Sequence, residues 1–180
     1  MRTRQPLPRH WLLTDERLGD RLFPALERLP EGAGVVFRHY SLEEPARRRL
    51  FEAVRAVTEA RDLVLLLAGP ADRARLWGAD GSHGRGAGAG LRSAPVHNYS
   101  ELRGAERAGA DFVFMSPVFA TQSHPGSPGM GLARFAWLAR RTRLPVIALG
   151  GMNQARGRTL ASFGAYGWGA IDAWAGDQGA

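Results

Sequence analysis

Short apolar runs alternate with segments of helical periodicity along the chain. The apolar runs predict eight strands, over residues 11–15, 34–40, 62–69, 78–84, 91–98, 110–116, 144–151 and 165–173. The run at 62–69, DLVLLLAG, is apolar throughout, as expected for a strand buried on both faces. The intervening segments predict helices over 20–29, 41–60, 70–77, 99–109, 133–141 and 153–164, and Ser41 and Glu44 have the spacing of a capping box.

Strands that alternate with helices predict a parallel sheet, because parallel neighbours need a long crossover connection. Eight such units predict an α/β fold of the closed (β/α)8 TIM-barrel type, of minimal size, with residues 1–180 as a single TIM-barrel domain. An open doubly wound sheet is the alternative. It stays open because the strands around the glycine-rich segment 84–90 are short and have little helix between them.

The composition is that of an ordinary globular protein, with 44% hydrophobic and 23% charged residues. No apolar run approaches the roughly 20 residues that span a bilayer, and no signal peptide is evident at the N-terminus. The chain has no Cys, which excludes disulfides and Cys nucleophiles. We therefore expect a cytoplasmic protein that does not bind a membrane.

The formal net charge is +7, and every basic residue is Arg rather than Lys. The absence of Lys excludes Schiff-base chemistry and a P-loop, since both need a Lys amine. The Arg residues are spread along the chain, and the densest run, 47–49, has no interleaved aromatics of the kind that binds single strands. We therefore expect no nucleic acid partner.

In a TIM barrel the chemistry lies at the carboxyl ends of the strands. His39, His83, His97 and His124 each follow or end a predicted strand, so four histidines are expected at this mouth. A His there can act as acid or base near neutral pH. A His-based metal site is the weaker reading, because no two histidines share a ligand spacing within one element.

Two segments at the same mouth suggest an anion site. Gly150 and Gly151 end the seventh predicted strand, directly before a helix whose N-terminus favours phosphate. The segment 116–132, SPVFATQSHPGSPGMGL, is far longer than most strand-to-helix connections and is rich in Ser, Thr, Gly and Pro. A functional loop is therefore favoured over a disordered one.

These segments resemble a known family. PVHNYSEL (95–102), GADFVFMSPVFATQSH (109–124) and PVIALGGM (145–152) are similar in order and spacing to motifs of the thiamine-phosphate synthase/TenI superfamily, as are VVFRHY (35–40) and GADGSH (78–83). The resemblance implies a TIM barrel that binds a thiazole phosphate. It implies that Gly150 and Gly151 bind phosphate and that Thr121 and Ser123 supply hydroxyls from a lid. Arg38 matches an Arg at the end of the family's second strand.

The chain also departs from the family pattern. The synthases need carboxylates for magnesium, but Ala68-Gly69-Pro70 stands at one of these positions and residues 81–100 contain no Asp or Glu. Tyr40 and His124 replace two family Lys residues. In the eighth predicted strand, Ile171-Asp172 stands where the family has Val-Ser, and the Asp172 carboxylate would repel phosphate.

Three hypotheses follow from the resemblance. The favoured one is a TenI-like isomerase that needs no metal or other cofactor and shifts a proton with His97 as acid and base, while Arg38, His83, His124 and Asp172 are further residues expected at the mouth. The second is a magnesium-dependent thiamine-phosphate synthase whose metal site uses Asp72 or Asp80. The third is a non-catalytic relative that binds a phosphate ligand. We expect a small phosphorylated thiazole-type partner, and the sequence leaves a homo-oligomer open.

Overall fold

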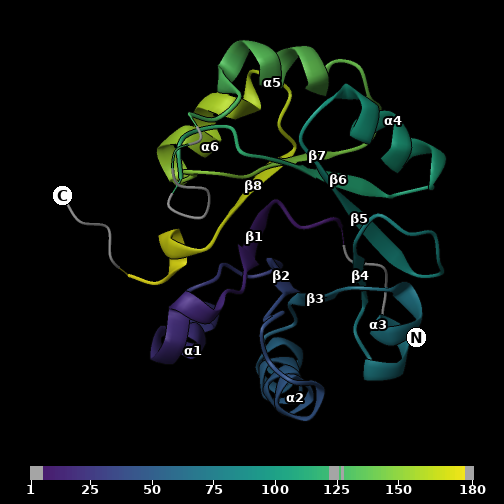
Figure 1. Cartoon of the computed structure of the whole chain (residues 1–180). Helices are drawn as coiled ribbons and strands as arrows, with labels where there is room; N and C mark the ends of the chain where they lie inside the picture. The colour runs from purple at the N-terminus through teal and green to yellow at the C-terminus, as the bar shows by residue number, and fades with distance from the viewer. Residues whose placement is uncertain (1–5, 122–125, 127, 177–180) are drawn as a thin grey trace.

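The computed structural model describes residues 6–121, 126 and 128–176. Eight parallel strands form a closed barrel in the order β1-β2-β3-β4-β5-β6-β7-β8 (Figure 1). The open-sheet alternative is therefore wrong, because β1 pairs with β8 through His10–Trp168, Trp11–Gly169 and Leu12–Ala170. The strands are β1 (His10–Leu13), β2 (Gly34–Phe37), β3 (Val64–Ala68), β4 (Gly81–His83), β5 (Leu91–Val96), β6 (Phe112–Met115), β7 (Val146–Ala148) and β8 (Gly167–Ala170).

Helices cover the outside of the barrel (Figure 1). They are α1 (Leu22–Glu27), α2 (Glu44–Ala60), α3 (Ala71–Trp77), α4 (Tyr99–Arg107), α5 (Gly131–Ala139) and α6 (Gln154–Ala161), with 3-10 helices η1 (Glu16–Arg21) and η2 (Asp172–Trp174). The glycine-rich residues 84–90 join β4 to β5 without a helix. Within the described part of the chain, no helix is both long and apolar enough to span a membrane.

Large aromatic side chains fill the inside of the barrel. The Trp11 ring lies 5.2 Å from the Phe112 ring and 5.3 Å from the Phe114 ring, measured between centroids. Gly34 on the neighbouring strand makes room for this indole, since a Cβ there would lie 2.4 Å from the ring. Because the interior is packed, a ligand can bind only at an end of the barrel.

The structure corrects the predicted start of the long second helix. The helix begins at Glu44, and Glu43 is its N-cap without a side-chain hydrogen bond. Ser41 lies before the helix, where its Oγ donates to Glu16 Oε1 at 3.0 Å and its amide donates to the same oxygen at 3.1 Å. The Ser41 side chain thus bonds Glu16, 25 residues earlier in the sequence, and does not form the predicted capping box with Glu44.

Candidate functional site at the barrel mouth

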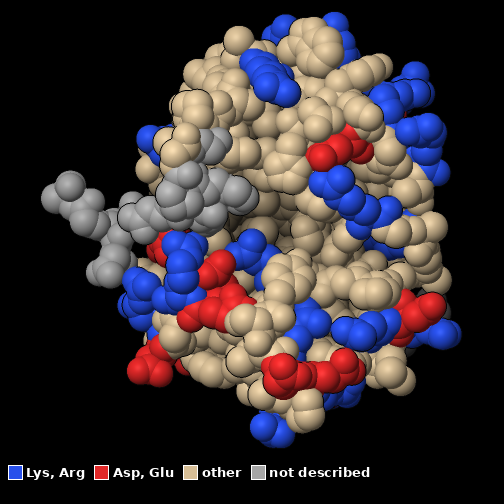
Figure 2. All heavy atoms as spheres, in the orientation of Figure 1, with Lys and Arg blue, Asp and Glu red and all other residues tan. Residues whose placement is uncertain are grey.

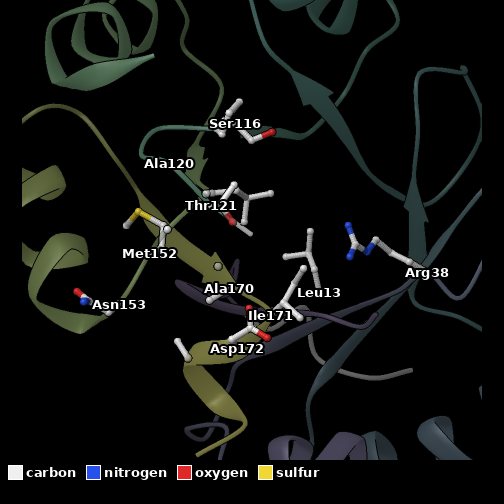
Figure 3. A pocket seen from close by; sticks show the side chains of 16 residues that line it. Leu13, Arg38, Ser116, Ala120, Thr121, Met152, Asn153, Ala170, Ile171 and Asp172 are labelled. Carbon is white, nitrogen blue, oxygen red and sulfur yellow. The ribbon is translucent and has the colours of Figure 1, made fainter. Parts of the chain in front are cut away.

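A pocket of about 310 Å³ opens at the carboxyl ends of the strands. The face shown in Figure 2 is hollowed near its centre, and Figure 3 shows the pocket from close by. Its lining comes mainly from the ends of β6, β7 and β8, with contributions from β1 and the end of β2. The lining residues are Leu13, Arg38, Ser116, Pro117, Ala120, Thr121, Leu149, Gly150, Gly151, Met152, Asn153, Gly169, Ala170, Ile171, Asp172 and Ala173.

The predicted glycine turn forms one side of this pocket. Gly150 and Gly151 have positive φ angles of 92° and 60°, and a Cβ at Gly151 would lie 2.5 Å from the carbonyl oxygen of Ala120. No described oxygen accepts a hydrogen bond from either amide N–H. Asn153, two residues after Gly151, caps α6 through its side chain, which accepts from Arg156 N at 2.9 Å. Free amides beside a helix N-terminus form an anion-binding surface.

The loop after β6 lies against this turn. Val118 N donates to Leu149 O at 2.7 Å, and Phe119 N donates to Gly150 O at 3.2 Å. Thr121 lines the pocket from this loop, as Figure 3 shows. The structure therefore brings Thr121 together with the glycine turn, whereas Ser123 and His124 lie outside the described residues.

Arg38 reaches the pocket from the opposite side, after the end of β2 (Figure 3). Its Nε donates to Thr14 O at 2.8 Å, and a terminal nitrogen lies 2.5 Å from Asp15 Oδ2. Burial raises the pKa of Asp15, but hydrogen bonds from Arg17 and the positive charge of Arg38 outweigh this and lower it. Asp15 is therefore ionised at neutral pH and holds the guanidinium in place. The sequence signal for Asp15 was its position at the end of the first predicted strand.

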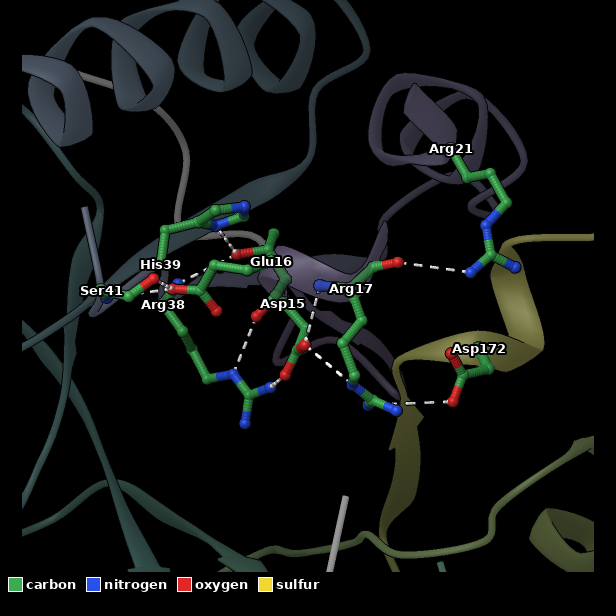
Figure 4. Close-up of polar contacts among 9 residues, drawn as sticks. Asp15, Glu16, Arg17, Arg21, Arg38, His39, Ser41 and Asp172 are labelled. Carbon is green, nitrogen blue, oxygen red and sulfur yellow. Dashed lines mark hydrogen bonds and ion pairs between the residues drawn. The ribbon is translucent and has the colours of Figure 1, made fainter. Parts of the chain in front are cut away.

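Asp172 lines the same pocket at the start of η2, and its side chain is 47% exposed. One carboxylate oxygen lies 4.0 Å from a terminal nitrogen of Arg17, the outer limit of an ion pair. Arg17 in turn contacts Asp15, as Figure 4 shows. The carboxylate that the sequence placed near the expected phosphate site therefore does lie in the pocket.

His97 does not line this pocket but follows β5, on the next strand round the barrel. Ser116 N, from the pocket lining, donates to Val96 O at 3.0 Å, which places His97 beside the pocket's edge. Its Nδ1 and its backbone amide both lie 2.8 Å from Glu101 Oε2, and Arg85 donates to Glu101 Oε1 at 2.9 Å. Since a carboxylate only accepts, Nδ1 carries a proton and donates it to Glu101, and Nε2 is the ring nitrogen that this contact leaves available.

Glu101 was not among the residues singled out from the sequence. Burial raises the pKa of Glu101, but hydrogen bonds from His97 and Arg85 outweigh this, so the net shift is downward. Its position four residues after His97, at the start of a predicted helix, was the available signal.

The other two described mouth histidines are buried. His83 Nδ1 lies 2.9 Å from Ser93 Oγ, and its ring packs edge-on against Phe114 inside the barrel. Burial, with a smaller contribution from Arg38, lowers the pKa of His83 to about 4. His39 bonds Thr14 Oγ1 at 3.0 Å and stacks on Phe37, and burial lowers its pKa as well. Both rings are neutral at pH 7.

The residues present do not fit a magnesium site of the kind that the synthases need. The described residues contain no group of three or more His, Asp or Glu side chains that could hold a metal ion. Asp72 is exposed on the first turn of α3. Asp80 precedes β4, and its Oδ2 accepts from Leu65 N near the start of β3, at the opposite end of the barrel from the mouth.

Comparisons with known proteins agree with the resemblance. The family model described as thiamine monophosphate synthase (TMP-TENI) matches residues 90–173. A putative thiamine-phosphate synthase 2 of Aquifex aeolicus is 30% identical over 180 aligned residues, which cover 89% of this chain and 94% of the relative. A thiamine-phosphate synthase of Syntrophomonas wolfei is 29% identical, over 91% of this chain and 86% of the relative. The solved thiamine phosphate pyrophosphorylase of Pyrococcus furiosus shares the fold, with a TM-score of 0.77 and 23% identity over 97% of this chain and 90% of that chain.

Proposed function

This chain belongs to the thiamine-phosphate synthase/TenI family of thiamine biosynthesis, and we propose that its mouth pocket binds a thiazole phosphate. We propose further that the protein shifts a proton on this ligand without magnesium, with His97 as the acid and base. The observation that carries the second step is the His97–Glu101 pair at the strand end beside the pocket.

The glycine turn supports the binding of the phosphate group. Gly150, Gly151 and the N-cap residue Asn153 line one side of the pocket, where we expect backbone amides to donate to phosphate oxygens. Thr121 adds a hydroxyl on the same side, since it lines the pocket next to Ala120. The ring of the ligand would then extend across the pocket, toward Ser116.

The His97–Glu101 pair supports the proton transfer. Glu101 fixes the tautomer of His97, so that Nε2 is available to take a proton from a ring carbon and return it elsewhere on the ring. A ring that lies over Ser116 comes beside His97, because Ser116 and Val96 are hydrogen-bonded neighbours. A positioned base of this kind contributes roughly 10²–10⁴-fold to a rate.

The test is a proton-shift assay on a thiazole carboxylate phosphate, followed by NMR with EDTA present. His97→Asn keeps an N–H that can donate to Glu101 but cannot relay a proton. We expect its kcat to fall by about 10²-fold or more, while calorimetry shows unchanged binding of thiazole phosphate. Unchanged turnover in His97→Asn would overturn the assignment of His97, and binding without turnover in the unaltered protein would favour the non-catalytic hypothesis.

The similarity to thiamine-phosphate synthases favours a second candidate, a thiamine-phosphate synthase. A synthase separates pyrophosphate from a pyrimidine, and the described mouth has no carboxylate cluster that would hold a metal for this step. The assay combines thiazole phosphate and pyrimidine pyrophosphate with magnesium. Magnesium-dependent formation of thiamine phosphate would establish this candidate in place of the first.

A further inference from the structure

Two of the side chains that line the pocket are charged, and they lie on opposite sides of one strand. Arg38 follows β2 and Asp172 follows β8, while Leu13 at the end of β1 lies between them and also lines the pocket (Figure 3). Strand β1 pairs with both β2 and β8. The pocket therefore has a positive side and a negative side.

A chain of ion pairs joins the two sides outside the pocket (Figure 4). Arg38 lies 2.5 Å from Asp15 Oδ2, Arg17 Nε lies 2.9 Å from Asp15 Oδ1, and Arg17 lies 4.0 Å from Asp172 Oδ2. The four charges alternate in sign and sum to zero. The chain thus gives the pocket a fixed polarity rather than a net charge.

The negative end of this chain is the less compensated one. Arg17 is bonded closely to Asp15 and touches Asp172 only at the limit of an ion pair. The negative charge of the Asp172 carboxylate is therefore only weakly compensated by Arg17, and it can interact with a ligand in the pocket. A phosphate on the glycine turn brings a second negative charge into the same pocket, and like charges a few ångströms apart repel.

A positively charged ring on the same ligand would be attracted to the Asp172 carboxylate, and this attraction would offset the repulsion between the carboxylate and the phosphate. We propose that Asp172 makes the pocket selective for a phosphorylated heterocycle whose ring is cationic, over the same phosphate with a neutral ring. This inference rests on the proposed function, since it assumes that the pocket binds a thiazole-type phosphate. Asp172 is then a specificity-determining residue, which accepts the positive ring while the glycine turn and Arg38 face the anionic parts of the ligand.

The experiment compares two probes by calorimetry at low ionic strength, with EDTA present. One is 4-methyl-5-(2-phosphooxyethyl)thiazole, which has a neutral ring, and the other is its N3-methyl thiazolium derivative. We expect the unaltered protein to favour the thiazolium phosphate about tenfold, and Asp172→Asn to reduce this ratio to near one. The change in the ratio between proteins cancels the steric effect of the added methyl group.

Glu31→Gln is the matched control. Glu31 is exposed and precedes β2, so this variant also replaces a carboxylate with an amide, but at the opposite end of the barrel. It should leave the ratio of the two affinities unchanged. In the unaltered protein the preference should also shrink as salt rises from about 0.05 M to about 0.3 M, because Asp172 is half exposed and open to screening.

The outcomes separate the inference from the function it rests on. Binding of both probes with the same ratio in Asp172→Asn as in the unaltered protein overturns the inference and leaves the proposed ligand class standing. Failure of both probes to bind overturns the inference and the proposed function together.

Discussion

Replacing Gly151 with alanine tests whether the turn after β7 is built as the structure shows. Gly151 has a φ angle of +60°, in the left-handed region that residues with a side chain rarely adopt. A Cβ at this position would lie 2.5 Å from Ala120 O and 3.1 Å from Phe119 Cβ. Both neighbours belong to the loop after β6, and Ala120 lines the pocket. The added methyl group must therefore displace the wall of the pocket.

The expected cost follows from two contributions. A side chain in the left-handed conformation costs about 1–2 kcal/mol, and relief of the contact with Ala120 adds to this. A total of about 2 kcal/mol corresponds to a fall in Tm of about 4–8 °C for a domain of this size. Because the loop after β6 has to move, we also expect the affinity for thiazole phosphate to fall about tenfold or more.

The assay is thermal unfolding followed by circular dichroism, with Gly104→Ala as the matched control. Gly104 lies inside α4, where a Cβ would meet nothing within 4 Å. Alanine in a helix interior is favoured over glycine by about 0.5–1 kcal/mol, so this variant should melt higher than the unaltered protein. A Gly151→Ala protein that melts with the unaltered protein and binds the phosphate normally would refute this account of the turn.

Three further predictions concern the histidines and Arg47. Burial lowers the pKa of His83 to about 4, below its unfolded value of 6.5, so its contribution to stability is present above about pH 6.5 and is lost as the pH falls toward 4. Urea unfolding from about pH 7 to about pH 4 should show a loss of roughly 3 kcal/mol from this group, and His83→Gln should flatten the curve. Glu101→Gln should lower kcat more than it changes KM, and NMR should show His97 shifting toward a mixture of tautomers. Arg47→Met should cost about 2–4 kcal/mol in chemical denaturation, because this buried side chain donates to the carbonyls of Arg38 and Ala68, which would lose their partners.

The sequence predicts the barrel because its strands are buried on both faces. In β3, for example, four of the five residues are buried, and the alternation of such runs with helices leaves few other topologies. Local patterns were less informative at the element ends. Residues 171–173, read as part of the last strand, belong in part to η2, and Ser41 pairs with Glu16 instead of capping α2. These outcomes depend on contacts between distant segments, which a local pattern does not contain.

The same distinction holds for the candidate site. A residue that follows a strand of a parallel barrel lies at the mouth, so the sequence could place Arg38, Thr121, Gly150 and Asp172 near one another, and all four line the pocket. It could not give the pairing of side chains around them. The contact of Asp15 with both Arg38 and Arg17 depends on the register of β1 with β2 and on side-chain conformation.

Two carboxylates, Asp15 and Asp172, lie on one side of this mouth, which indicates a changed ligand preference and not only the loss of a metal site. The loops after β3 and β4 lack the acidic residues that the synthases need for magnesium, through Ala68-Gly69-Pro70 and the glycine-rich segment 84–90. On the other side of the mouth, Asp15 and Asp172 stand beside arginines in an alternating chain. Asp15 is held closely by Arg38 and Arg17, whereas Asp172 touches Arg17 only at the outer limit of an ion pair and faces the pocket. Negative charge thus lies where a cationic ring would sit, which is the arrangement that the thiazolium probe tests.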